Sequence, residues 1–179
     1  MSTDAQVIPV FPLSSDDDID FDLLDCVPSG SGVNIIDDEE LNEKSVIELS
    51  GKDSRITFYM SSPYPWFVFH VNSCGRYATI NLIVKDDLCA ERLIEISSKK
   101  SSILVEKKSC KLPMEIGEGW QRICFDIGDI VNRAFGARFE SCLEVTISGG
   151  CKFSKIFFQN EQYSDPELPP FLRVAKIAR

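Results

Sequence analysis

One stretch of the chain, residues 119–136, joins a strand pattern to a helical pattern. It begins with a strand-like run from Trp120. Apolar residues then recur at i, i+3, i+4, i+7 and i+8, which places them on one face of a helix; they are Ile127, Ile130, Val131, Ala134 and Phe135. Asp126 can cap this helix by accepting N–H groups of its first turn, and Gly136 can end it in a left-handed conformation. The pattern predicts one short helix over about residues 126–135.

Most of the remaining chain is predicted to form strands. Period-two alternation or short apolar runs, which are typical of strands, occur at 45–50, 56–60, 66–71, 77–85, 92–97, 102–106, 112–116, 143–147 and 151–158. Turns that contain glycine join the first two of these runs and the last two, which predicts two hairpins. Many short strands with one late helix predict an all-β fold, an antiparallel β-sandwich of the jelly-roll-like kind.

The two ends of the chain differ from this pattern. Residues 1–18 predict an acidic, weakly ordered N-terminal segment, although the apolar residues from Val7 to Leu13 favour a short edge strand, with prolines that exclude a central one. Proline-rich residues near the other end predict an extended C-terminal arm. We therefore expect a single β-sandwich domain over 19–174, followed by a tail at 175–179.

The net charge of −9 is unevenly distributed. Residues 1–44 hold 12 acidic residues and one basic residue, a net −11, whereas residues 45–179 hold 16 acidic and 18 basic residues, a net +2. The acidic runs indicate either a solvated segment or a docking segment for a basic partner. A body at +2 argues against nucleic-acid binding but does not repel an acidic protein surface.

The sequence also bears on compartment and cofactors. No apolar run approaches the roughly 20 residues of a membrane span, and the N-terminus lacks the features of a secretory signal, so we expect a cytoplasmic protein that is not secreted. The seven cysteines are odd in number and none forms Cys-x-x-Cys, which argues against a disulfide framework or a metal site. Cys124 and Cys142 are expected in the core, and no cofactor is predicted.

Catalytic chemistry has little support in the sequence. The lone histidine, His70, lies in an apolar run and is interpreted as structural, because a catalytic triad needs a nucleophile and an orienting acid beside it. Asp126 and Asp129 are interpreted as a helix cap and a dipole partner. No enzyme is therefore predicted.

Two kinds of binding remain open. Three aromatic residues are candidates for stacking on sugar rings, which keeps a ligand- or carbohydrate-binding β-sandwich module as an alternative; they are Tyr64, Trp66 and Trp120, although Trp120 is also expected to be buried at the strand-to-helix junction. A second set of residues either is ordinary solvated surface or contacts an acidic partner; it consists of Asn132, Arg133, Arg138, Lys152 and Lys155.

An ordered series of short motifs carries a family resemblance. In chain order they include Cys110-Lys-Leu-Pro-Met114, Gly119-Trp120, Arg133-Ala-Phe-Gly136, Cys151-Lys-Phe and Tyr163-Ser-Asp-Pro-Glu-Leu-Pro169. The series resembles the cilia- and flagella-associated protein 20 family over about residues 33–174, most closely from Cys110 to Leu172. Its fold landmarks here are Gly119, Trp120, Asp126, Gly136 and Cys151.

The resemblance implies a non-enzymatic β-sandwich protein of the axoneme or basal body. Family members lie at the inner junction of the doublet microtubule, contact tubulin and neighbouring junction proteins, and are linked to cilium stability and motility. The family usually opens with a basic strand that begins Met-Phe-Lys, whereas this chain begins Met-Ser-Thr-Asp and has a body at only +2. The chain thus resembles a divergent paralogue, expected in the cilium or flagellum.

Overall fold

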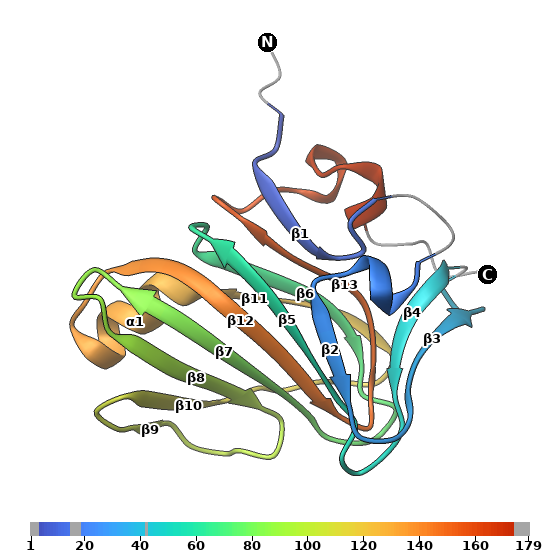
Figure 1. Cartoon of the computed structure of the whole chain (residues 1–179), viewed down its shortest axis with the longest axis horizontal. Helices are drawn as coiled ribbons and strands as arrows, with labels where there is room; N and C mark the ends of the chain where they lie inside the picture. The colour runs from blue at the N-terminus through green and yellow to red at the C-terminus, as the bar shows by residue number, and fades with distance from the viewer. Residues whose placement is uncertain (1–3, 15–18, 42, 174–179) are drawn as a thin grey trace.

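The computed structural model describes residues 4–14, 19–41 and 43–173, and in it two β-sheets face each other (Figure 1). Sheet I contains, in spatial order, β11 (Trp120–Asp126), β6 (Trp66–Asn72), β13 (Lys152–Gln159), β4 (Glu43–Leu49) and β3 (Val33–Asp38), with β1 (Val7–Phe11) also paired to β13. Sheet II contains β2 (Cys26–Ser29), β5 (Arg55–Ser62), β12 (Phe139–Gly149), β7 (Ala78–Asp86), β8 (Glu91–Ser97), β10 (Ser109–Pro113) and β9 (Leu104–Val105). The all-β sandwich is confirmed, although β8 and β10 run parallel in a sheet that is otherwise antiparallel.

The core lies between the sheets and is rich in phenylalanine. On sheet II, β7 alternates strictly, and its even-numbered side chains from Ala78 to Asp86 are buried. On sheet I, Phe67 lies 5.4 Å from Phe69 and 5.0 Å from Phe158, measured between ring centroids. Rings at these separations prefer tilted or offset contacts, and these three form one aromatic cluster on the inner face of sheet I.

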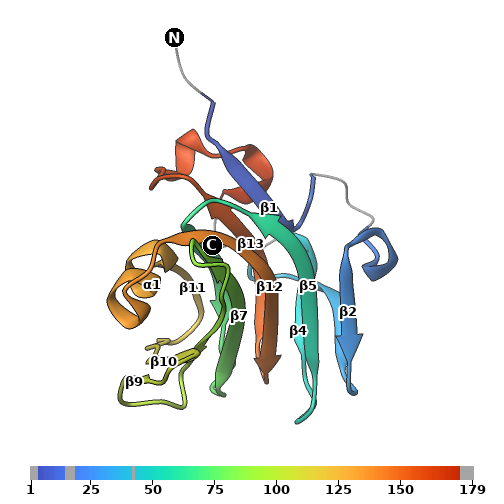
Figure 2. The same cartoon turned by 60° about the vertical axis from the view of Figure 1, so that its left-hand side comes forward.

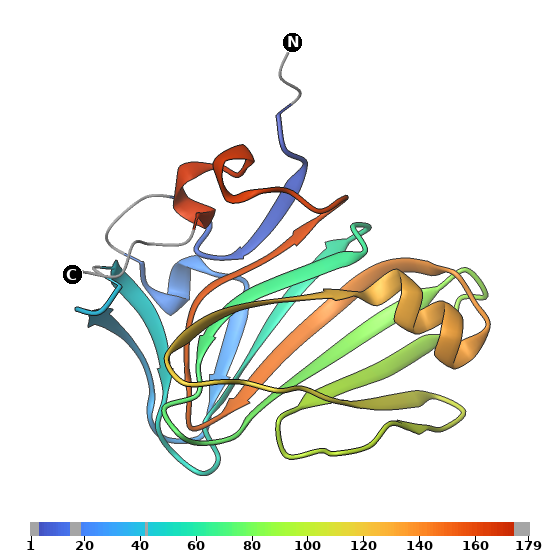
Figure 3. The same cartoon turned by 180° about the vertical axis from the view of Figure 1, so that it is seen from behind.

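The C-terminal segment covers the outer face of sheet I. It forms two short 3₁₀ turns, η2 (Asp165–Glu167) and η3 (Pro170–Leu172), rather than the expected extended arm. A proline lies at the start of each turn. The first N–H groups of a helical turn have no partner within it, so the N–H that proline lacks costs no hydrogen bond there. Leu168 and Leu172 are buried against Val68 and Phe157 of β6 and β13. Figure 3 shows the turns lying beyond β13, on the opposite side of the molecule from the helix.

The two predicted hairpins are wrong. β4 lies in sheet I and β5 in sheet II, and likewise β13 lies in sheet I and β12 in sheet II. The glycine-containing turns between these strands therefore carry the chain from one sheet to the other. An alternating strand has one buried face in either arrangement, so the pattern alone does not distinguish a hairpin from such a crossing.

Part of the N-terminal segment, which was predicted to be weakly ordered over residues 1–18, forms regular structure. Val7–Phe11 form the edge strand β1, which pairs antiparallel with β13 (Figure 2). Phe11 is fully buried and belongs to the main core cluster. A short 3₁₀ turn, η1 (Phe21–Leu23), leads into β2. The acidic run Asp16–Asp18 and the tail 175–179 lie outside the described residues.

Replacing Phe11 with alanine tests whether β1 is part of the fold. Because the ring is completely buried, we expect Phe11→Ala to lower the free energy of unfolding by about 3–5 kcal/mol. Leu13→Ala is the matched control, since Leu13 is 47% exposed and the change should stay within about 0.5 kcal/mol. Urea denaturation measures both, and equal, small effects would mean that β1 does not contribute to stability.

Candidate partner-binding site

The helix α1 (Ile127–Phe135) matches the predicted position and is capped at both ends. The Asp126 carboxylate accepts a hydrogen bond from the Asp129 N–H at 3.1 Å, and Gly136 adopts a left-handed φ of 64°. Ile127 and Val131 are fully buried. These contacts fix the helix, so its polar face is presented in one orientation.

The polar face of α1 carries two of the candidate contact residues, Asn132 and Arg133, and a third, Arg138, follows just after the helix. Asn132, Arg133 and Arg138 are all exposed. Arg133 Nε lies 3.1 Å from Asp129 Oδ2, in a pair whose side chains are 81% and 51% exposed. A pair this exposed contributes at most about 0.5 kcal/mol, so the Arg133 guanidinium can exchange Asp129 for a carboxylate of a partner at little cost.

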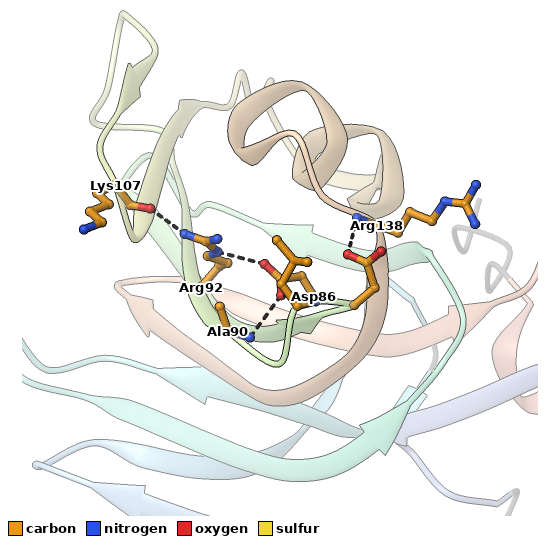
Figure 4. Close-up of polar contacts among 7 residues, drawn as sticks. Asp86, Ala90, Arg92, Lys107 and Arg138 are labelled. Atoms are coloured by element: carbon orange, nitrogen blue, oxygen red, sulfur yellow. Dashed lines mark hydrogen bonds and ion pairs between the residues drawn. The ribbon is translucent and has the colours of Figure 1, made fainter.

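A buried carboxylate holds the β7–β8 turn beneath the helix (Figure 4). The Asp86 carboxylate accepts hydrogen bonds from the N–H groups of Leu88 and Ala90 and from Arg92 Nε, at 2.9–3.0 Å. Burial alone would raise the pKa of Asp86, but these hydrogen bonds outweigh it and hold the pKa below its usual value. The Arg92 guanidinium in turn lies 4.8 Å from the centroid of the Phe135 ring, at the end of α1.

The chain leaving the helix is fastened to the same turn. Asp87 accepts a hydrogen bond from the Arg138 N–H at 3.0 Å and donates its own N–H to the Arg138 carbonyl at 2.9 Å. We call the two exposed arginines here, Arg133 in the last turn of α1 and Arg138 just after the helix, the supported surface. Nothing local in the sequence shows that Asp86 and Asp87 meet Arg92 and the backbone of Arg138.

The two candidate lysines lie elsewhere. Lys152 Nζ lies 3.5 Å from Asp38 Oδ2, and Lys155 is buried. Arg138 directly precedes β12, whereas Lys152 follows its far end, and a strand of 11 residues spans about 35 Å. The five predicted contact residues therefore do not form one face, and of these five Arg133 and Arg138 are the exposed basic ones.

His70 is buried on the outer side of sheet I. It lies in register with Arg122 of β11 and Lys155 of β13. Burial, together with the positive charges of Arg122 and Lys155, lowers the pKa of His70 to about 3. An imidazole with this pKa does not take up a proton near neutral pH, which fits the structural interpretation better than a role in acid–base catalysis.

The aromatic candidates do not converge on one platform. Trp66 and Trp120 are both half-buried, and in the β6–β11 pair Trp66 stands opposite Asp126 whereas Trp120 stands opposite Asn72. Six residues of strand separate the two positions by about 20 Å. Tyr64 packs against the core. Trp120 thus starts β11 at the end far from α1, so its predicted burial at the strand-to-helix junction is wrong.

The expectation that both Cys124 and Cys142 are core residues is half right. Cys142 is buried, but Cys124 is exposed because it lies on the outer face of the edge strand β11. Burial raises the pKa of Cys142 and of the landmark Cys151 to about 12, so both stay protonated. Among the residues that the structure describes, no group of His, Cys, Asp and Glu side chains is arranged to hold a metal.

A cleft of about 870 Å³ opens at the loop end of the sandwich, away from α1. It is lined mainly by the β6–β7 turn and by residues 114–119. Its charged side chains have both signs, with Arg76 and Lys100 beside Glu115 and Glu118. This mixture selects for no particular ligand charge.

No helix in the described parts of the chain is long and apolar enough to span a membrane.

The buried imidazole predicts a loss of stability in mild acid. The unfolded chain takes up a proton near pH 6.5, but folded His70 does not until about pH 3, so stability falls as pH drops through this window. Between pH 7 and pH 5 the expected loss is about 2 kcal/mol. It is measured as the difference between the pH profiles of the native protein and His70→Gln.

The chain has only one histidine, so NMR titration of its ring protons gives an independent reading on the folded protein. A midpoint near 6.5 would contradict the burial of His70.

The Asp86 network gives a second prediction. Asp86→Ala leaves Arg92 without its carboxylate and removes the acceptor for two N–H groups, so the melting temperature should fall clearly. Glu91→Ala is the matched control, because Glu91 is an exposed neighbour on β8. If both variants melt at the same temperature, the network does not hold the turn.

Comparison with known proteins places the chain in a family. Residues 3–176 match the CFA20 domain. The chain is 29% identical to the Cilia- and flagella-associated protein 20 of Paramecium tetraurelia, over 75% of each sequence. It is 29% identical to the protein of that name from Caenorhabditis elegans, over 76% of this chain and 71% of the relative. With the Chlamydomonas reinhardtii protein the identity is 28%, over 71% and 72%.

Solved structures add little to this comparison. The glycoside hydrolase domain of Endo-D from Streptococcus pneumoniae R6 overlays 78% of this chain with 22% of its own, at 8% identity and a TM-score of 0.38. This overlap is too loose to support any conclusion. The CFA20 domain match, by contrast, covers residues 3–176, and it shows that this protein belongs to the CFA20 domain family.

Proposed function

We propose that the protein is a non-enzymatic structural component of cilia or flagella. In this proposal it acts in the axoneme or basal body, where it binds doublet microtubules at the inner junction together with neighbouring axonemal proteins. The observation that carries the proposal is the match to the CFA20 domain over residues 3–176, together with the similarity to relatives named Cilia- and flagella-associated protein 20 in three organisms. The role is supporting cilium stability and motility.

The geometry supports binding rather than catalysis. The lone imidazole is buried and neutral, and the thiols of Cys142 and Cys151 are held protonated. The supported surface at the end of α1 instead presents Arg133 and Arg138 on a fixed backbone. Two guanidinium groups in fixed positions suit the carboxylates of an acidic partner such as tubulin.

Localisation of a tagged copy in a ciliated cell tests the proposal. We expect the protein in cilia or at basal bodies, and we expect it to remain with the axoneme after detergent extraction. Arg133→Glu with Arg138→Glu should lower that retention at least fivefold, because both changes place negative charge on the helix-end surface.

Lys52→Glu with Arg55→Glu is the control, since it changes the net charge equally at exposed positions on the loop end. A native protein that is absent from cilia and fully solubilised by detergent would overturn the proposal. Equal loss from both double variants would keep the axonemal role but remove the α1 surface from it.

A further inference from the structure

The loop that carries β9 is exposed throughout residues 99–108. At its centre three apolar side chains face solvent, with Ile103 65% exposed and Leu104 and Val105 each 48% exposed. Two lysines precede this triplet and two follow it, at positions 99, 100, 107 and 108, and the only acidic residue among the ten is Glu106, for a net +3. We call residues 99–108 the lysine loop.

Within the lysine loop the sequence predicted a strand over residues 102–106. In the structure the strand is shorter: β9 consists of Leu104 and Val105, which pair with β10. β9 is the last strand of sheet II and pairs with β10, with Leu104 opposite Lys111 and Val105 opposite Cys110. Among the strands in the described residues, none pairs with its outer side. The sheet therefore ends in an open edge at this point.

The hydrogen-bond pattern shows which backbone groups that edge offers. Glu106 N–H donates to the Ser109 carbonyl at 2.8 Å, which makes Glu106 and Ser109 a hydrogen-bonded pair. Such pairs alternate along an antiparallel ladder, so Leu104 also directs its N–H and C=O toward β10. Ile103 and Val105 direct theirs away, toward the free edge.

Contacts with β8 and β10 hold the lysine loop in place. β10 pairs with β8 over five residues, and Arg92 donates a hydrogen bond from its guanidinium to the Lys107 carbonyl (Figure 4). The Leu93 N–H donates to the Lys108 carbonyl at 2.9 Å. The edge is thus positioned before any partner arrives, which lowers the entropy cost of binding.

We propose that β9 is a docking edge for an acidic, extended segment of a partner protein, which adds to sheet II as a further strand. The outward N–H and C=O groups of Ile103 and Val105 pair with its backbone, as in other cases of strand addition. The exposed aliphatic side chains accept its apolar residues. The lysines on both sides attract its carboxylates.

The same features favour a peptide over a nucleic acid. A phosphate backbone neither pairs with a strand edge nor uses an exposed aliphatic triplet. A short acidic strand uses all three features of the loop. This inference does not depend on where in the cell the protein acts.

Titration of the full-length protein with two synthetic peptides tests the proposal. The first alternates glutamate with valine over seven residues. The second replaces each valine by proline, which keeps the charge but fixes φ at about −65° and removes every second N–H, so that its pairing with a strand edge is weakened. In NMR spectra of the ¹⁵N-labelled protein, the valine peptide should shift the amides of Ile103 and Val105 and slow their hydrogen exchange. The proline peptide should bind at least tenfold more weakly.

Variants locate the site. Lys107→Glu with Lys108→Glu should weaken binding of the valine peptide at least tenfold, and Val105→Pro should do the same by removing an outward N–H without breaking a bond to β10. Lys52→Glu with Arg55→Glu should change the affinity less than twofold.

Several results would overturn the proposal. These are an absence of binding at millimolar peptide, equal binding of the two peptides, amide shifts centred away from β9, or an equal loss in the Lys52 and Arg55 control. Self-association in sedimentation experiments that Lys107→Glu with Lys108→Glu abolishes would also overturn it, because the occupant would then be a second copy of this chain.

Discussion

The central strands β6 and β13 carry apolar side chains on both faces, and sheet I is stable only when both faces are covered. Sheet II covers the inner face through the phenylalanine cluster, and Leu168 and Leu172 cover Val68 and Phe157 on the outer face. Leaving Val68 and Phe157 in water would cost about 1.5–3 kcal/mol each. The C-terminal turns are therefore part of the sandwich. Burial of the same face also removes His70 from water and keeps it neutral.

Features that depend on neighbouring residues were predictable from the sequence. The helix begins at its Asp126 cap and ends at Gly136, as expected, because capping and stopping act within one turn. The alternation of β7 and the continuous burial of β6 were also visible in the order of apolar residues. The fold class follows from such local signals added together.

Features that depend on distant residues were not predictable. The chain between β4 and β5 has the composition of a hairpin turn, yet it connects the two sheets, because pairing is decided by strands that lie elsewhere in the sequence. Lys155 looked like a surface lysine but is buried. The supported surface at α1 needs Asp86, Asp87 and Arg92, whose contacts with the helix region no local pattern shows.

The order of the strands along the chain determines when the protein can fold during synthesis. β12 lies between β5 and β7, and β13 lies between β6 and β4, so each sheet receives a central strand late in the domain. Sheet II cannot close until Gly149 has left the ribosome, and sheet I cannot close until Gln159 has, so the phenylalanines of β6 stay open to water until then. Such non-local pairing slows folding and prolongs the exposure of apolar surface. The nascent chain is therefore expected to depend on chaperones until its last strand emerges.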